Sequence, residues 1–223
     1  MASRREEKYL LDYRIYRLIK NRVSLVLHPD THYPDGAYTV TSLYFDDPYK
    51  TAYYEKADGL SLHTKFRIRS YNFSDDFLRL EKKTKHGLVT SKDSAIITKT
   101  ELTELVKSPF VLNGFSTKLY PLAAEIQSKG MRPTITVRYR REAFFFEGTD
   151  ARVTFDTRTE SLPRDIECLF NEKCIGIPTI HPLSIIMEIK YGNKLPALIR
   201  NLCASDAPLL SVSKYALCTN SFE

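Results

Sequence analysis

The sequence predicts an α+β fold in which helices pack on the outside of an antiparallel β-sheet. Polar and apolar residues alternate with a period of two in several stretches, as in strands with one buried face. The connections between consecutive stretches are short, which favours antiparallel pairing, and the segments between them carry aliphatic residues at helical spacing. Because the 223-residue chain is 43% hydrophobic and contains no repeat or linker, we expect a single domain over residues 1–223.

The N-terminal part of the chain is predicted to contain two strands and two helices. Over residues 4–11 the simplest interpretation is a charged strand that enters the domain, although the spacing alone favours a solvated tail. Asp12 is suited to cap a helix over residues 13–22. Residues 37–47 are rich in β-branched and aromatic side chains, which favours a strand. Pro48 then suits the first turn of a short helix over residues 49–55.

The most regular alternation lies in residues 64–85, where we expect two strands joined by a turn at residues 72–76. One face of this hairpin is almost wholly charged, and the other is apolar. The charged face carries Lys65, Arg67, Arg69 and Tyr71, then Arg79, Glu81, Lys83 and Lys85. The ordinary explanation is a hairpin with one face on a core and the other in water.

The later elements follow the same two patterns. Strands are predicted for residues 88–97, 132–146, 152–159 and 185–191, helices for 100–107, 118–129 and 194–202, an irregular segment for 162–182, and a short terminal element for 212–215. The charged faces of the last three strands are expected to carry Arg138 and Arg140, Arg152 and Asp156, and Glu188 and Lys190. A basic face sprinkled with carboxylates therefore recurs on several strands.

A sheet that brings such faces together needs an anion between them. Two cations about 4 Å apart repel by roughly 4 kcal/mol at an effective protein dielectric near 20. The net charge is only +6, with 33 basic and 27 acidic residues, so the clustering matters more than the total. A sheet that curls with its charged faces inward would form a wet, cationic tunnel for a polyanion.

Several classes of protein are disfavoured by what the sequence lacks. The four cysteines form no CxxC pair, so we expect reduced thiols and neither a zinc site nor a disulfide framework. No apolar run approaches the eighteen or so residues of a membrane span, and no signal-peptide core is present, so we expect a soluble, cytoplasmic protein. P-loop, nucleophile-elbow and zincin motifs are also missing.

Cations at alternating strand positions suit phosphoryl transfer, which depends on positioning and charge neutralisation more than on a protein nucleophile. Mg²⁺ or Mn²⁺ would be held by one or two carboxylates and by the phosphates themselves. Glu6, Glu81, Asp156 and Glu188 are the available carboxylates, and a salt bridge to a neighbour is the alternative role of each. Nucleic acid is not expected as a partner, because single-strand binders place aromatics among the cations. Here the aromatics alternate onto the apolar faces.

Eight short motifs occur in order along nearly the whole chain: RREEKY at 4–9, SLYFDD at 42–47, KFRIRSY at 65–71, LEKKTK at 80–85, RPTITVRYRREAF at 132–144, RVTFDT at 152–157, IMEIKY at 186–191 and VSKY at 212–215. Together they resemble the VTC domain, the catalytic module of vacuolar-transporter-chaperone polyphosphate polymerases and their bacterial relatives, within the triphosphate tunnel metalloenzyme fold. The resemblance implies an eight-stranded antiparallel β-barrel that forms a tunnel, with helices packed outside.

The resemblance also implies a function: a metal-dependent polyphosphate polymerase that transfers the γ-phosphate of ATP to a growing polyphosphate chain. ATP and polyphosphate would be its partners, Mn²⁺ or Mg²⁺ its cofactor, and Glu188 the metal ligand. Matching motifs place the catalytic cations at Lys83, Arg140, Arg152 and Lys214. The wider phosphate- and nucleotide-binding set is Lys8, Arg67, Arg69, Lys83, Lys85, Lys92, Arg140, Arg152, Lys190 and Lys214.

The sequence departs from the family pattern in residues 88–94. Relatives usually carry a second cluster of lysine and arginine there, whereas Lys92 is the only cation in this segment. Two alternatives to the polymerase share the same pocket. One is a tunnel triphosphatase or polyphosphatase, and the other is a non-catalytic sensor that binds polyphosphate or a nucleotide.

Overall fold

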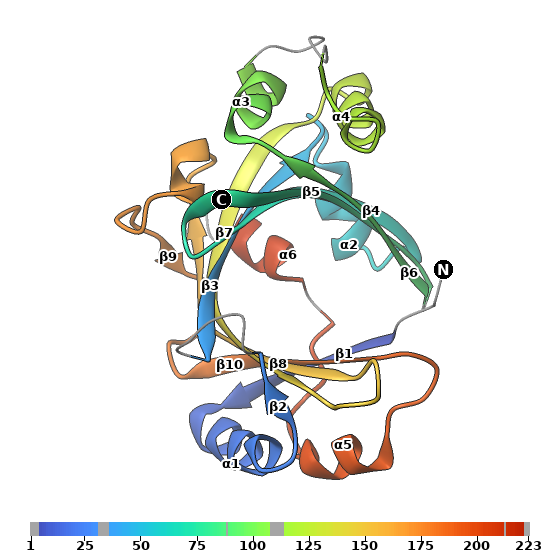
Figure 1. Ribbon diagram of the computed structural model, residues 1–223, viewed down its shortest axis with the longest axis vertical. Helices are drawn as coiled ribbons and strands as arrows, with labels where there is room; N and C mark the ends of the chain where they lie inside the picture. Colours follow the sequence, from blue (N-terminus) through green and yellow to red (C-terminus); the bar gives the residue numbers. More distant parts are fainter. Residues whose placement is uncertain (1–4, 31–35, 88, 108–113, 212, 221–223) are drawn as a thin grey trace. The chain divides into compact units, whose positions relative to one another are not determined.

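The computed structural model describes residues 5–30, 36–87, 89–107, 114–211 and 213–220 (Figure 1). Eight longer strands follow one another in a single sheet in the order β1-β10-β8-β7-β3-β4-β5-β6, and two short strands, β2 and β9, pair with β7 and β8. Every pairing with a described register is antiparallel. The predicted α+β class and its eight-stranded antiparallel sheet are therefore confirmed.

The strands are β1 (Arg5–Asp12), β2 (His28–Pro29), β3 (Ala37–Asp46), β4 (Leu62–Tyr71), β5 (Ser74–His86), β6 (Val89–Ile97), β7 (Arg132–Phe145), β8 (Arg152–Leu162), β9 (Ile177–Pro178) and β10 (Ser184–Tyr191). The helices are α1 (Tyr13–Ser24), α2 (Thr51–Ala57), α3 (Lys99–Lys107), α4 (Leu119–Ser128), the 3₁₀ helix η1 (Ile166–Leu169), α5 (Ala197–Leu202) and α6 (Lys214–Thr219). Arg4, Leu88 and Val212, which the sequence placed at the starts of elements, lie outside the described residues.

The chain divides into two compact units. Unit 1 comprises Met1–Tyr38, Tyr139–Thr159 and Ile180–Ser211, and unit 2 comprises Thr39–Arg138, Glu160–Thr179 and Val212–Glu223. Strands β7 and β8 contribute residues to both units. The single domain expected over residues 1–223 stays a prediction.

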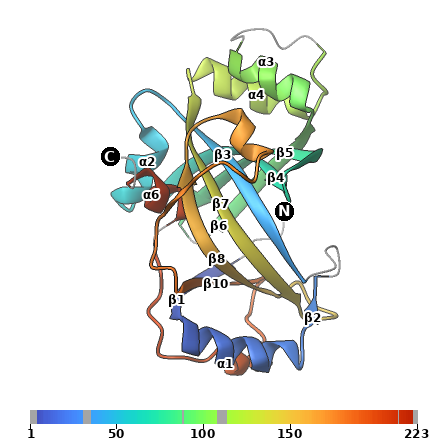
Figure 2. The ribbon, with the colours of Figure 1, turned by 90° about the vertical axis from the view of Figure 1, so that its left-hand side faces the viewer.

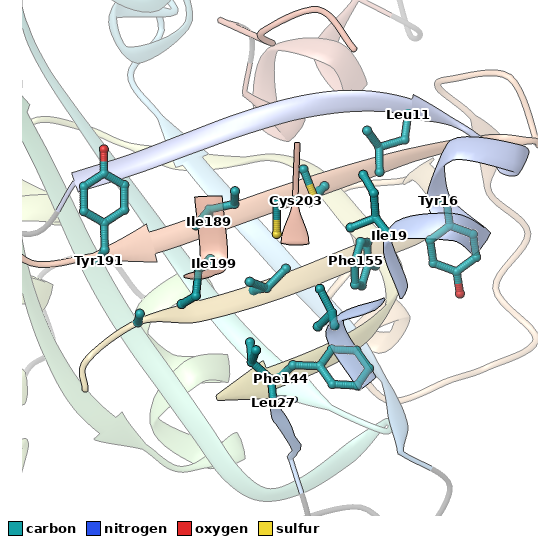
Figure 3. Close-up of a cluster of buried hydrophobic side chains, with 14 of the residues drawn as sticks. Leu11, Tyr16, Ile19, Leu27, Phe144, Phe155, Ile189, Tyr191, Ile199 and Cys203 are labelled. Atoms are coloured by element: carbon teal, nitrogen blue, oxygen red, sulfur yellow. The ribbon is translucent and has the colours of Figure 1, made fainter. Parts of the chain in front are cut away.

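In unit 1, α1 and α5 cover the apolar face of the strands (Figure 1). Asp12 caps α1 as predicted, because its Oδ1 accepts a hydrogen bond from the Ile15 amide at 2.9 Å. Ile19 of α1 and Ile199 of α5 are fully buried with Phe155 and other strand residues, as Figure 3 shows. Because side chains alternate along a strand, the residues between these core positions lie on the opposite face of the sheet.

In unit 2, α3 and α4 lie side by side in both views (Figures 1 and 2) and bury an apolar cluster with the strands. Phe66 of β4 and Leu80 of β5 are among its fully buried members. The hairpin turn is tighter than predicted. Asn72 and Phe73 both have positive φ, 47° and 62°, and β5 begins at Ser74. A two-residue turn of this kind matches the twist of the paired strands.

The prediction that all four cysteines are reduced thiols is wrong for one pair. Cys168 and Cys174 form a disulfide in unit 2, with Cα atoms 5.6 Å apart, whereas Cys203 and Cys218 are free and buried. The 3₁₀ helix η1 and the turn after it bring the two cysteines together, in a segment where the sequence indicated only irregular structure. Among the described residues, no helix has the length and apolarity required to cross a membrane.

Candidate functional site

The sheet face of unit 1 opposite α1 carries a group of six charged residues linked by ion pairs, here called the Glu188 cluster. The register of β1 and β10 sets Lys8 opposite Glu188, and Glu6 opposite Lys190. The register of β10 and β8 then adds the neighbouring column of side chains. The members of the cluster are Glu6, Lys8, Arg141, Asp156, Glu188 and Lys190.

Glu188 is only 4% exposed and has three cationic neighbours. Its Oε1 lies 3.8 Å from the Lys8 Nζ, and its Oε2 lies 3.2 Å from the Lys190 Nζ and 3.5 Å from an Arg141 nitrogen. Burial would raise the pKa of this carboxyl, but Lys190, Lys8 and Arg141 hold it well below its usual range. Glu188 is therefore a buried carboxylate that stays ionised.

Arg141 is the residue that the sequence analysis missed. Its guanidinium binds Asp156 in a bidentate pair, with Nε–Oδ1 at 2.6 Å and the second nitrogen to Oδ2 at 2.7 Å. The predicted site residue Arg140 is exposed and lies on the opposite face of β7, so its assignment to the charged face is wrong. Thr136 and Val137 are neighbours on β7 and point to opposite faces, yet both are fully buried. Burial therefore does not alternate along this strand, and the alternation in the sequence did not identify the site face. The only sequence signal was the pair of adjacent arginines.

The donor chemistry of the Glu188 cluster fits a hard divalent cation. The Lys8 ammonium lies 3.1 Å from a Glu6 oxygen and 3.8 Å from a Glu188 oxygen, so the two carboxylates lie near each other. Carboxylate oxygens are the kind of ligand that Mg²⁺ and Mn²⁺ prefer. Both oxygens of Asp156 accept hydrogen bonds from Arg141. Within the described ranges, no group of three or more His, Cys, Asp or Glu side chains is arranged to hold a metal. A metal here would be held by one or two carboxylates and completed by substrate oxygens.

Two further polar groups on this face have unused hydrogen-bonding capacity. Thr154 lies directly opposite Glu188 in the strand register and is 1% exposed, and its hydroxyl has no partner among the described residues. Arg152 lies opposite Lys190, and one of its terminal nitrogens donates to the Tyr38 hydroxyl at 2.9 Å. Its Nε has no partner in the described part of the chain. With respect to the described residues, both groups are thus buried, unsatisfied donors on the same sheet face as Glu188.

Unit 2 contains a second charged group, here called the Glu81 cluster: Tyr44, Arg67, Arg69, Glu81 and Lys92. Glu81 is 1% exposed, and its Oε2 accepts from the Arg67 Nε at 2.8 Å and lies 3.9 Å from an Arg69 nitrogen. Lys92 contacts the other carboxylate oxygen. Burial raises the pKa of Glu81, but these cations outweigh burial and place it far below its usual range. Three cations thus share one carboxylate, which leaves an excess of positive charge.

The surroundings of Tyr44 show the same excess of positive charge. Its hydroxyl accepts a hydrogen bond from Arg67 at 2.9 Å. Burial alone would raise the pKa of this phenol, yet Arg67, Arg69 and Lys214 together lower it below its usual value. Lys214, the first residue of α6, is therefore close enough to add to the positive potential of the Glu81 cluster.

A row of lysines crosses three adjacent strands of unit 2. The registers set Lys83 of β5 opposite both Lys65 of β4 and Lys92 of β6, and Lys85 lies two residues further along the same face as Lys83. Lys65 donates to the Ser213 hydroxyl at 2.8 Å, at the N-terminus of α6. Like charges directly opposite one another destabilise a sheet. This arrangement is expected for a surface that binds an anion.

Apart from Arg140, the predicted site residues thus fall into two sets. Lys8, Arg152, Glu188 and Lys190 lie on one face of unit 1, and Arg67, Arg69, Lys83, Lys85, Lys92 and Lys214 belong to unit 2.

A scan against family models matches residues 3–223 to the VTC domain. No curated protein matches the chain. Solved structures share the fold at low identity. HpAC1 from Hippeastrum, described as a candidate adenylyl cyclase that reveals a dominant triphosphatase activity, has a TM-score of 0.58 and 15% identity, over 99% of this chain and 96% of that one.

Two microbial structures give similar results. The PH1819 protein of Pyrococcus horikoshii OT3 has a TM-score of 0.52 and 14% identity, over 98% of this chain and 99% of that one. A candidate adenylate cyclase from Bacillus halodurans has a TM-score of 0.51 and 12% identity, over 85% and 80% of the two chains. At these identities the likeness establishes a shared fold alone.

Proposed function

The chain belongs to the VTC domain family, and from this premise we propose that it is a metal-dependent polyphosphate polymerase that uses ATP. The observation that carries the proposal is the Glu188 cluster, where three carboxylates and three cations share one sheet face. Phosphoryl transfer needs such a mixture, because the carboxylates suit a divalent metal and the cations neutralise phosphate oxygens. No protein nucleophile is required.

In the proposed reaction, a terminal oxygen of the polyphosphate chain attacks the γ-phosphorus of ATP. The bond between this phosphorus and the β–γ bridging oxygen breaks, and ADP leaves. Lys8 and Lys190 already lie beside Glu188 and would bind non-bridging oxygens, and Arg152, opposite Lys190 in the strand register, adds positive charge to the same face. A divalent metal at Glu188 would supply further charge neutralisation on the transferred phosphoryl group.

The excess of cations in the Glu81 cluster supports a ligand with several phosphates. Glu81 neutralises one charge, while Arg67, Arg69 and Lys92 bring three. Lys83 adds to the same face by its position in the strand register. Arg141 replaces Arg140 in the proposal, as the residue that orders Asp156 and contacts Glu188.

A second candidate function is a triphosphatase, which the described activity of HpAC1 favours. The two reactions need the same binding groups and differ in the acceptor, which is water in the hydrolase and a phosphate chain in the polymerase. Purified protein incubated with ATP and Mn²⁺ or Mg²⁺ separates them when ADP, free phosphate and long-chain polyphosphate are followed together. ADP with polyphosphate supports the polymerase. Free phosphate without polymer contradicts it and supports the triphosphatase, and ligand binding without turnover supports a sensor.

The role of Glu188 is tested by Glu188→Gln. We expect this variant to lose metal-dependent turnover while it keeps measurable binding of ATP, because the amide cannot replace the anionic metal ligand. Glu147→Gln is the matched control, since the Glu147 side chain is 84% exposed and pairs only with His28 among the described residues. Full activity of Glu188→Gln would exclude the metal role.

A further inference from the structure

Unit 1 contains a cavity on the sheet face opposite the Glu188 cluster. Its volume is about 280 Å³, and β1, β10, α5 and the residues after α5 form its walls. Glu7 alternates with Glu6 and Lys8 along β1, so it points away from that cluster. The cavity walls combine charged, aromatic and apolar side chains, principally Glu7, Tyr9, Ile189, Leu195, Arg200 and Cys203.

The acidic side of the cavity is Glu7, which two phenols hold in place. The Tyr191 hydroxyl donates to Oε1 at 2.5 Å, and the Tyr9 hydroxyl donates to Oε2 at 2.7 Å. Each carboxylate oxygen can accept a further hydrogen bond. Burial, with a contribution from Glu7, raises the pKa of Tyr9 to about 12, so this phenol remains a donor. Within the described chain, Glu7 has no cationic partner within 4 Å.

The basic side of the cavity is Arg200, on the last turn of α5. Its guanidinium has no carboxylate partner among the residues that the structure describes, so it is available to an anionic group. The rest of the wall includes Ile189, Leu195 and Cys203, each no more than 6% exposed. Burial raises the pKa of the Cys203 thiol to about 12, so this side chain acts as a small neutral group.

We propose that this cavity binds a free α-amino acid with an aliphatic side chain. A simple anion would be repelled by Glu7, and a simple cation by Arg200, whereas a zwitterion satisfies both groups. The ammonium group would bind Glu7, the carboxylate would bind Arg200, and the aliphatic side chain would contact Ile189 and Leu195. The volume lies just below the usual range of about 300–1,000 Å³ for small-molecule pockets, which suits a ligand as small as an amino acid.

The proposal is tested by calorimetric titration of the full chain with three matched compounds in the absence of ATP. L-leucine carries both charges, 4-methylpentanoate lacks the ammonium group, and 3-methylbutylamine lacks the carboxylate. We expect leucine to bind and each analogue to bind at least about tenfold more weakly, because each leaves one charged wall residue unpaired. Equal binding of the three compounds, or no binding of leucine at millimolar concentration, would overturn the proposal.

Arg200→Gln assigns any binding to this cavity. The residue is exposed and has no internal ion pair among the described residues, so the variant should keep its fold. We expect it to weaken leucine binding at least about tenfold, whereas Arg14→Gln, an exposed arginine on α1 that does not line the cavity, should leave it unchanged. Unaltered affinity in Arg200→Gln would place the leucine elsewhere and contradict the proposal.

Discussion

Arg140 and Arg141 are neighbours on β7 with opposite surroundings. Arg140 is exposed, whereas Arg141 is 7% exposed and compensates the charges of Asp156 and Glu188. Burial would lower the pKa of Arg141, but Asp156 and its other partners raise it well above the ordinary value. The guanidinium is therefore a permanent charge that the buried carboxylates depend on.

Arg141→Met should lower the free energy of unfolding by about 3–5 kcal/mol, because it leaves the buried Asp156 carboxylate without its cation. Arg140→Ala should change it by no more than about 0.5 kcal/mol, as is usual for an exposed site. Urea unfolding of both variants measures the difference. Similar losses in the two would mean that the Arg141–Asp156 pair contributes little.

Ionisation of Glu81 makes the free energy of unfolding depend on pH. Its folded-state pKa lies below that of an unfolded glutamate, about 4.3, so the stabilisation is complete above that value and is lost as the pH falls below it. We expect the difference in unfolding free energy between the wild type and Glu81→Gln to be constant from pH 7 to about pH 5.5 and to shrink at lower pH. Urea unfolding at several pH values measures this difference. A difference that grew on acidification would contradict the assignment.

At the scale of elements, local signals served best where one face of an element is buried. The N-cap of α1, the hairpin of β4 and β5 and the aliphatic stripes of α3 and α4 were all predicted from periodicity and capping chemistry. Element starts were less accurate: α2 begins at Thr51 and α5 at Ala197, both later than expected. The Asp46 and Asp47 carboxylates cap the first turn of α2 from outside the helix. The order of elements was correct nonetheless.

The Cys168–Cys174 disulfide clamps the segment that carries η1. It closes a short loop, with a sequence separation of 6, so loop-closure entropy predicts a stabilisation of about 2 kcal/mol. We expect reductant to lower the unfolding free energy of the wild type by this amount. Cys174→Ser should be equally destabilised and insensitive to reductant. A wild type that reductant leaves unchanged would show that the disulfide does not contribute.

At the scale of the whole molecule, β7 and β8 connect the two units through the backbone, because each strand has residues in both. We expect one cooperative unfolding transition, since melting either strand removes ladder partners in both units. Far-UV circular dichroism and the fluorescence of the 14 tyrosines, in a chain without tryptophan, should give coincident urea curves. Two separated transitions would contradict the single domain predicted for the chain.

The sequence by itself determined the class of the fold, the order of its elements and which side chains share a strand face. These properties depend on local periodicity, capping and turn chemistry, and the order of the motifs indicated the family. Only the tertiary structure decided that Arg141, and not Arg140, contacts Glu188 and that Glu81 pairs with three cations. It also decided that Cys168 forms a disulfide with Cys174. The physical reason is that alternation separates the two faces of a strand but does not identify their neighbours. Those neighbours follow from registers between strands that are far apart in the chain.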